Sequence, residues 1–361
     1  MSTTPRRIPL YEADFASNPQ AAYRRMREES GPLVPVDLAP GVPATLVVGY
    51  EQARRILGDP MRFPSDPRAW QKTIPDTCPV LPMMEWRPNA LRSAGTEHAR
   101  YRAANTTALD AIDQHALRAL VEKAAHQTIS GFRHDGKADL LAQYAWPIAF
   151  HVLSTLLGCP DQIGHRIADG MAKIFDGVNA TIGNQILTQA VTDLVALRRH
   201  QPGNDLTTRL LSHTVRLDDT EMIHQIVTLY GAGIEPLTNL ITNTLLRLLT
   251  HIGFSGDLHA ADASVREALD TVLYRDPPLA NFCMSYPHAP WTSTTFSCPP
   301  TSQWSSPWPP ATTTPPSGPH PPSATAPTSP GAPGRTAARP AATPTSSPKR
   351  PSTTSSTPSP R

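Results

Sequence analysis

Two basic residues one helical turn apart are the first candidates for binding chemistry. Residues 95–102 read Gly-Thr-Glu-His-Ala-Arg-Tyr-Arg. In a helix, His98 and Arg102 are four residues apart and project from one face. Such a pair can hold an anionic group through charge-assisted hydrogen bonds. The alternative is an exposed, charged helix start that binds no ligand.

A second candidate lies where a long apolar helix should be weakest. Residues 230–236 read Tyr-Gly-Ala-Gly-Ile-Glu-Pro, in the middle of a helix predicted over 219–250. A glycine inside a helix costs about 1 kcal/mol and a proline about 3 kcal/mol. Pro236 removes a backbone donor and crowds the carbonyl of Ala232, so we predict that the helix bends or opens there. A defect of this kind beside Glu235 leaves room for a ligand, whereas the alternative is a plain packing kink.

The elements that position these residues are mostly helical. Apolar residues recur at three- and four-residue spacing, with Pro and Gly between several of the segments. Helices are predicted over 18–29, 51–57, 97–111, 115–132, 140–157, 162–175, 182–199, 206–213, 219–250 and 263–273. Residues 34–50 have β-type side chains broken by Pro and Gly, which suits a small hairpin. The predicted fold class is mainly α, with a small β element on the N-terminal side and a core large enough to enclose a bulky ligand.

The last 73 residues, 289–361, have a different composition from the rest. They hold 20 of the 41 prolines and no Leu, Ile, Val, Met, Tyr, Asn, Asp or Glu. With no aliphatic side chain larger than Ala, this segment cannot bury enough apolar area to offset chain entropy. We therefore predict one domain over 1–288 and a disordered tail rich in Pro, Thr and Ser over 289–361.

The simplest cause of this composition is a shifted reading frame. Only Phe296, Gln303, His320 and Lys349 have codons that exclude G and C at the middle base. A GC-rich gene concentrates G and C at the third codon position, and a one-base slip moves that position to the middle. The tail is therefore interpreted as out-of-frame translation.

Composition excludes several other classes of protein. The formal net charge is +2, and the few basic residues of the tail are too dispersed for a nucleic-acid site. The four cysteines show neither zinc-site spacing nor a disulfide framework. The N-terminus lacks a signal-peptide core, and the most apolar stretch, 140–157, is too short and polar to span a bilayer. We expect a cytoplasmic protein without membrane or nucleic-acid partners.

Taken together, in this order and spacing, the segments resemble the cytochrome P450 superfamily, specifically its soluble bacterial type, over residues 8–288. The resemblance implies a P450-like helical fold and haem b as the cofactor. It implies that His98 and Arg102 hold the haem propionates. It also implies that Ala232 and Gly233 line the oxygen pocket and that Glu235 is the acid of a proton relay.

The resemblance also implies an activity and its partners. A haem-thiolate monooxygenase acts on paired donors with dioxygen, taking electrons from a ferredoxin and ferredoxin reductase. The oxygen atom would enter a small apolar substrate. Substrate specificity would lie in variable loops near 66–91 and 170–184.

Three departures from the family pattern bear on that activity. Pro236 stands where the family normally has a Thr, so the hydroxyl is absent. Residues 271–274, Thr-Val-Leu-Tyr, replace the ExxR pair of the K-helix, which suggests an atypical subgroup. The cysteine loop that ligates the iron has no match, because Cys298 lacks the framing glycine and Cys283 comes too early. No metal ligand is therefore assigned in this frame. The fold is expected to be truncated before the haem-ligand loop, and the protein is expected to be inactive.

The shifted frame is consistent with an intact P450. A one-base slip lets residues 334–340 encode Gly-Pro-His-Arg-Cys-Pro-Ala, with the cysteine at the codon of Ala338. We hypothesise that the frame breaks between Tyr286 and Ala289. Two alternatives stay open: a non-catalytic helical remnant, and a helical binding protein with a Pro-rich interaction tail unrelated to haem.

Overall fold

The computed structural model describes residues 7–175, 179–250, 261–279 and 283–288, and the short segments 291–293, 296–298 and 303–304. The chain divides into two compact units, 1–314 and 315–361, and every described residue belongs to the first. The predicted boundary at residue 288 therefore stays a prediction.

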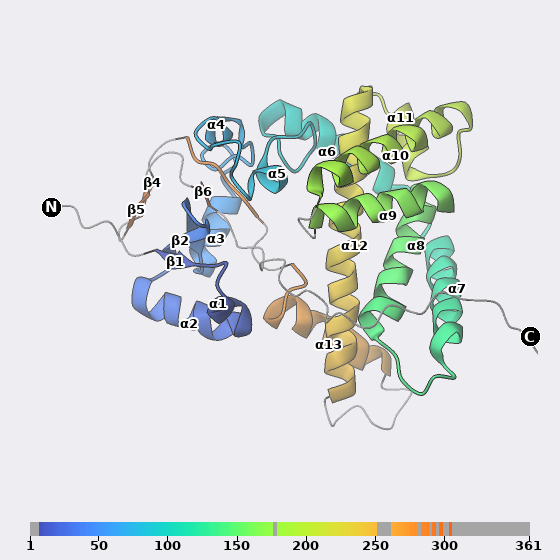
Figure 1. Cartoon of the computed structure of the whole chain (residues 1–361), viewed down its shortest axis with the longest axis horizontal. Helices are drawn as coiled ribbons and strands as arrows, with labels where there is room; N and C mark the ends of the chain where they lie inside the picture. The colour runs from blue at the N-terminus through green and yellow to red at the C-terminus, as the bar shows by residue number, and fades with distance from the viewer. Residues whose placement is uncertain are drawn as a thin grey trace, which may run out of the picture. The chain divides into compact units, whose positions relative to one another are not determined.

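Helices dominate the first unit (Figure 1). In chain order they are α1 (Ala13–Ser17), α2 (Pro19–Ser30), α3 (Tyr50–Leu57), α4 (Arg68–Gln71), α5 (Leu81–Met84), α6 (Gly95–Asp110), α7 (Gln114–Phe132), a π-helical turn (Leu141–Ala145), α8 (Trp146–Leu156), α9 (Asp161–Phe175), α10 (Ala180–His200), α11 (Leu206–Ser212), α12 (Asp219–Thr250) and α13 (Ala261–Arg275). Among the described residues, no helix has the length and apolar character needed to cross a membrane.

A small sheet lies on the N-terminal side, as predicted. Strand β2 (Leu33–Ala39) pairs antiparallel with β3 (Val42–Val47), β1 (Ile8–Pro9) runs parallel to β2, and β6 (Gln303–Trp304) runs parallel to β3. Val34, Val36, Ala44 and Leu46 are buried against α1 and α2. On β2, buried Val34 and Val36 alternate with half-buried Pro35 and Asp37, and the buried residues of the sheet form a cluster separate from the main helical core.

The predicted tail contains three of the described strands. Besides β6, they are β4 (Trp291–Ser293) and β5 (Phe296–Cys298), which form an antiparallel pair. The other residues of 289–361 lie outside the described residues, so the predicted disorder of the tail is untested there.

The main core is made by the helices of residues 104–234. Helix α12 contributes Met222, Ile226, Tyr230 and Ile234, a stripe at four-residue spacing that is 0–5% exposed. Helix α10 supplies Leu187, Ala190, Val191, Leu194 and Val195 to the same core. Figure 1 shows α12 as a long rod, and both α8 and α10 contact it. Ile223, Val227 and Leu229, between the members of the stripe, are partly buried and pack against the edge of the same core.

The sequence predicted that this long helix bends or opens at Pro236; the opening does not occur, and the bend stays a prediction. Helix α12 is continuous from Asp219 to Thr250 with Pro236 inside it. The prediction that it opens at Pro236 is wrong, because proline removes only one backbone hydrogen bond. The buried stripe on both sides of residue 232 keeps the two halves in register.

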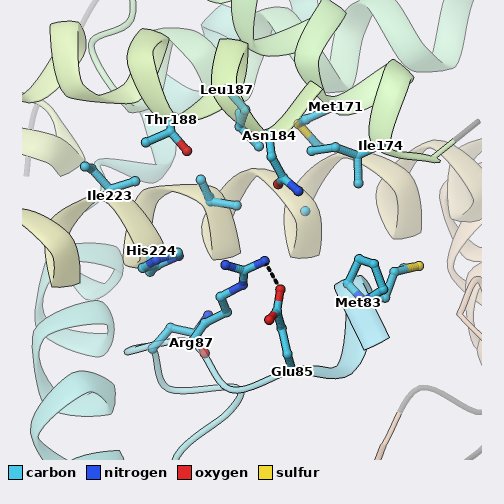
Figure 2. A pocket seen from close by; sticks show the side chains of 14 residues that line it. Met83, Glu85, Arg87, Met171, Ile174, Asn184, Leu187, Thr188, Ile223 and His224 are labelled. Atoms are coloured by element: carbon cyan, nitrogen blue, oxygen red, sulfur yellow. Dashed lines mark hydrogen bonds and ion pairs between the residues drawn. The ribbon is translucent and has the colours of Figure 1, made fainter. Parts of the chain in front are cut away.

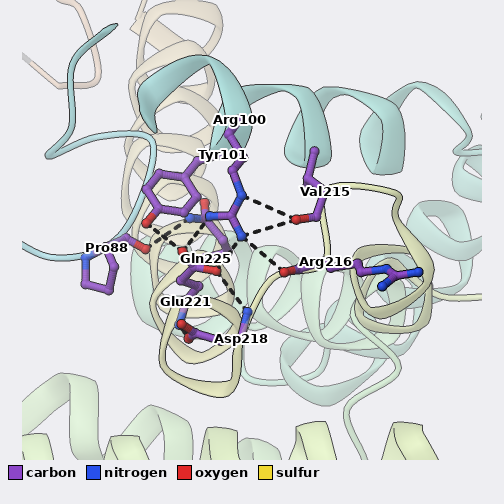
Figure 3. A network of polar contacts seen from close by, with 8 residues as sticks. All are labelled: Pro88, Arg100, Tyr101, Val215, Arg216, Asp218, Glu221 and Gln225. Carbon is purple, nitrogen blue, oxygen red and sulfur yellow. Dashed lines mark hydrogen bonds and ion pairs between the residues drawn. The ribbon is translucent and has the colours of Figure 1, made fainter. Parts of the chain in front are cut away.

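A polar network fixes the crossing of α6 over α12 (Figure 3). The Arg100 guanidinium donates to both Glu221 carboxylate oxygens, at 2.5 and 2.8 Å, and the Tyr101 hydroxyl donates to the same carboxylate at 3.0 Å. The Glu221 carboxylate also accepts from the Asp218 amide, while Asp218 accepts from the Glu221 amide, which closes a capping box at the start of α12. The hydrogen bonds to Arg100 lower the pKa of Glu221 to about 2.

The two helical glycines of α12 should respond differently to the same substitution. A Cβ at Gly231 meets no atom within 4 Å, whereas one at Gly233 comes within 2.7 Å of Leu153 Cδ2. We expect Gly231→Ala to raise the free energy of unfolding by about 1 kcal/mol through helix propensity. Gly233→Ala should gain less or lose, because Leu153 must move. Urea unfolding of both variants checks this, and equal stabilisation of the two would contradict the assigned packing of Gly233.

The ion pair between Arg100 and Glu221 should stabilise the fold in a pH-dependent way. We expect Glu221→Gln to lower the free energy of unfolding by about 2 kcal/mol near neutral pH, since charge-assisted hydrogen bonds are lost. The pKa of Glu221 is about 2 in the folded chain against the usual 4.5, so the stabilisation is complete above 4.5 and fades as pH falls toward 2.

The matched control is Glu122→Gln, which breaks the exposed pair of Arg118 and Glu122 on α7. That variant should change stability by less than about 0.5 kcal/mol. Chemical unfolding of both variants at about pH 7 and about pH 3 tests the assignment. A Glu221→Gln effect that is small, or that does not shrink in acid, would rule it out.

Candidate functional site

One pocket collects residues from three distant parts of the chain (Figure 2). Its volume is about 400 Å³, within the usual range for small-molecule sites. The lining comes from residues 82–89, from α9 and α10, and from the first half of α12 as far as Gly231. Segments 66–91 and 170–184, which we expected to determine substrate specificity, both contribute residues to the lining of this cavity.

The pocket has an apolar wall and a polar wall. Met171, Ile174, Leu187, Ile223 and Val227 form the apolar wall on α9, α10 and α12. Opposite them, Figure 2 shows Arg87 and Glu85 rising from the loop below α12, with His224 on the helix beside Arg87. Such a lining suits a ligand whose body is apolar and whose end is polar.

Charge at the polar wall is concentrated on Arg87. Its guanidinium donates to the Glu85 carboxylate at 2.5 Å, and both side chains are about one-third exposed. Burial, and secondarily the positive charge of Arg87, lower the pKa of His224 to about 4, so its imidazole is neutral near pH 7. Burial also lowers the pKa of Arg92, and Arg87 adds to that effect.

Hydrogen bonds from neighbouring elements hold the loop that carries Arg87. Gln225 of α12 donates through Nε2 to the Pro88 carbonyl at 3.2 Å and accepts at 2.9 Å from Asn105 of α6. Arg92 donates to the Met83 carbonyl at 2.6 Å. The loop is therefore tied to the crossing of α6 and α12, as Figure 3 shows for Pro88 and Gln225.

The basic pair predicted from the sequence lies on α6. His98 is half-buried, and its Nδ1 lies 2.8 Å from the Ala90 carbonyl, so Nδ1 carries a proton there. Arg102 is exposed, and within the described part of the chain no carboxylate is recorded in an ion pair with it. Arg100, two residues earlier, is by contrast neutralised by Glu221. Of the two arginines in this segment, Arg102 is thus the one available to an added anion.

The predicted oxygen-side residues of α12 do not share one environment. Ala232 is exposed, because it lies opposite the buried stripe of Tyr230 and Ile234. Gly233 faces Leu153 of α8 instead, where a Cβ would clash. In the described residues it is Gly231 that opens onto the pocket.

Glu235 and Pro236 are both half-buried on the same helix. Burial raises the pKa of Glu235, so its carboxyl holds a proton at higher pH than an exposed glutamate does. Thr238, one turn after Glu235, is 4% exposed, and its hydroxyl has no hydrogen-bond partner among the described residues. An orphaned hydroxyl here was not anticipated from the sequence, and only the burial of its face could have indicated it.

The described cysteines do not form a metal site. Cys78 and Cys159 are buried in separate clusters, and Cys283 is exposed. Burial raises the pKa of Cys159, which keeps it a thiol rather than a thiolate. No group of three or more His, Cys, Asp or Glu suited to a metal ion occurs in the part of the chain that the structure describes.

Contacts between α6 and α12 limit what the two predicted clusters can share. The hydrogen bonds that join these helices involve Glu221 and Gln225, seven or more residues before Ala232. At 1.5 Å rise per residue, that is about 10 Å along the helix. Among the described residues, no hydrogen bond or ion pair joins His98 or Arg102 to Glu235 or Pro236.

Sequence reasoning overlooked the residues that build the pocket's polar wall and its supports. Arg87, His224 and Gln225 carry no motif. Asp218 and Glu221 could have been found, since Asp-x-x-Glu at the start of a helix is a capping-box pattern. No local sequence pattern indicates that Arg100, far away in the chain, binds the Glu221 carboxylate of this capping box.

The similar proteins found by sequence comparison are bacterial cytochromes P450. The cytochrome P450 monooxygenase PikC of Streptomyces venezuelae is 30% identical over 286 residues, which cover 77% of this chain and 67% of that protein. Cytochrome P450 107B1 of Saccharopolyspora erythraea is 27% identical over 287 residues, covering 75% and 69%. No family model matches the chain.

Solved structures show the same fold. CYP154C4 from a Streptomyces species aligns with a TM-score of 0.70 at 23% identity, covering 84% of this chain and 77% of that one. PksS of Bacillus subtilis aligns with a TM-score of 0.69 at 22% identity, covering 82% and 76%. With the order of helices, the small N-terminal sheet and the identity to PikC, the conclusion is that this chain belongs to the cytochrome P450 family.

Proposed function

We propose that the gene encodes a cytochrome P450-type haem monooxygenase, and that the chain in its present frame is the substrate-binding part of that enzyme without its iron ligand. The observation that carries this is the pocket of Figure 2, which is built from parts of both segments assigned to substrate specificity and extends along α12 as far as Gly231. Haem b, when bound, would supply activation of dioxygen for insertion into a substrate.

The donors on α6 fit the anionic edge of haem. Arg102 is exposed and has no recorded carboxylate partner among the described residues, and His98 uses only Nδ1 within the fold. Because Nδ1 already donates to the Ala90 carbonyl, Nε2 is the ring nitrogen of His98 left to face an added ligand. These two residues would hold the propionates.

The iron ligand does not fit the described residues. Cys78 and Cys159 are buried in apolar clusters, and Cys283 lies in a segment that does not match the family's cysteine loop. The chain in its present frame is therefore proposed to be inactive. A frame break between Tyr286 and Ala289 accounts for this, since the shifted frame can place a cysteine at the codon of Ala338.

On the oxygen side, this chain offers an acid without the usual neighbouring alcohol. Ala232 is the small exposed residue that would lie against the cofactor, and Gly233 lets α8 pack closely behind it. Glu235 would hold a proton, helped by its raised pKa. Pro236 provides no hydroxyl, so proton transfer is expected to be less well directed than with Thr.

The intact enzyme would take electrons from a ferredoxin and its ferredoxin reductase. Its cytoplasmic location and the assignment to a subgroup without the ExxR pair stay predictions. The second candidate function, a non-catalytic remnant, is favoured by the missing thiolate ligand. A separate role for the Pro-rich tail has no supporting observation in the described residues.

Spectroscopy of two chains separates these outcomes. After expression with haem supplied, the chain in its present frame should show no Soret band of thiolate-ligated haem. A chain whose frame is restored at the codons for 286–289 should show one. A thiolate Soret band in the present chain, or its absence from the restored chain, would refute the proposal. Resequencing the gene across these codons tells whether the break is biological.

Removing the proposed propionate donor should weaken haem retention. In the frame-restored chain, Arg102→Gln should accelerate haem transfer to an apo-globin acceptor by about tenfold, because a charge-assisted hydrogen bond is lost. Arg118→Gln, at an exposed arginine of α7, is the matched control and should leave the rate unchanged. Equal rates for Arg102→Gln and the parent chain would remove Arg102 from the site.

A further inference from the structure

We propose that the pocket of Figure 2 selects an amphipathic monoanion, with Arg87 binding the anionic group and the apolar wall holding a hydrocarbon body. This inference rests on the proposed function, since it names the substrate class of that pocket. It narrows the expectation of a small apolar substrate to one with an anionic end.

The charge balance at the polar wall favours an anion. Arg87 and Arg92 are near enough for the charge of one to lower the pKa of the other, and Glu85 is the carboxylate recorded in an ion pair with Arg87 among the described residues. The Glu85 contact uses one guanidinium nitrogen of Arg87. An arginine fork has five N–H donors, so Arg87 keeps donors for a second carboxylate.

Other carboxylates near this wall are already engaged. Glu97 pairs with Arg68 at 2.8 Å, and Glu221 pairs with Arg100. Asp218 accepts from the Glu221 amide as the cap of α12. None of them is recorded with Arg87, so the second site on its guanidinium is left to a ligand.

The polar groups beside Arg87 also favour an anionic ligand. His224 is neutral near pH 7 because burial and Arg87 lower its pKa to about 4. A neutral imidazole adds a hydrogen bond without attracting a cation. The hydrogen bond from Gln225 to the Pro88 carbonyl holds the backbone of the Arg87 loop, and the contact with Glu85 holds the guanidinium itself.

The length of the pocket sets the size of the body. It is lined along α12 from Ile223 and His224 to Gly231, a span of seven residues after His224 and so about 10 Å. Over this distance the wall is formed by Ile223, Val227 and the side chains of α9 and α10. A medium-length alkyl chain fits with its anionic end at Arg87 and its far end at Gly231.

Binding of two matched probes to the full chain tests this without any catalytic readout. Equilibrium dialysis with radiolabelled decanoate and decanamide compares an anion with a neutral molecule of the same length. We expect decanoate to bind at least about tenfold more tightly than decanamide at low ionic strength. Arg87→Gln should remove that preference by weakening decanoate alone, and Arg87→Lys should retain part of it.

The matched control is Arg62→Gln, at an exposed arginine that pairs with Asp59 away from the pocket. It should leave both affinities unchanged, and circular dichroism checks that every variant is folded. Equal affinity for the two probes, a parallel loss of both in Arg87→Gln, or no saturable binding of either would overturn the inference. These results are independent of the Soret test. A restored chain with a thiolate band and no preference for the anion would refute this inference and leave the proposed function standing.

Discussion

The Glu221 carboxylate is the point on which the arrangement of this fold depends. It closes the N-terminus of α12 through its capping box with Asp218, and it binds Arg100 and Tyr101 of α6. One turn later, Gln225 joins Asn105 of α6 to the Pro88 carbonyl. Glu221 and Gln225, one turn apart on α12, thereby hold both the helix that carries His98 and Arg102 and the loop that carries Arg87.

This arrangement separates two kinds of basic residue. Arg100 is used inside the fold, because a half-buried guanidinium needs a carboxylate and carbonyl acceptors, which Glu221, Val215 and Arg216 provide. Arg102 points elsewhere, since residues two apart on a helix lie on different faces. The structural ion pair thus holds α6 in place while leaving a neighbouring charge unneutralised for a ligand.

Periodicity was enough to locate the main helices but not the contacts between them. The helix predicted over 219–250 coincides with α12, and the one predicted over 97–111 begins and ends within two residues of α6. The short helices α4 and α5 were not predicted, because four residues carry too little periodicity. Arg87, His224 and Gln225 act through tertiary contacts that no local pattern encodes. The helix does not open at Pro236, because tertiary packing on both sides outweighs the cost of one lost hydrogen bond.

The position of the proposed frame break explains why the chain can still build a pocket. The main core draws its buried residues from Ala104 to Ile234, and the sheet core from Leu10 to Leu46. Every described residue that lines the pocket lies between Pro82 and Gly231. A shift of frame after Tyr286 therefore changes neither core nor pocket lining, while it removes the segment that the family uses to ligate iron. Under the proposed function, the residues that line the pocket are encoded before the break and the thiolate ligand after it.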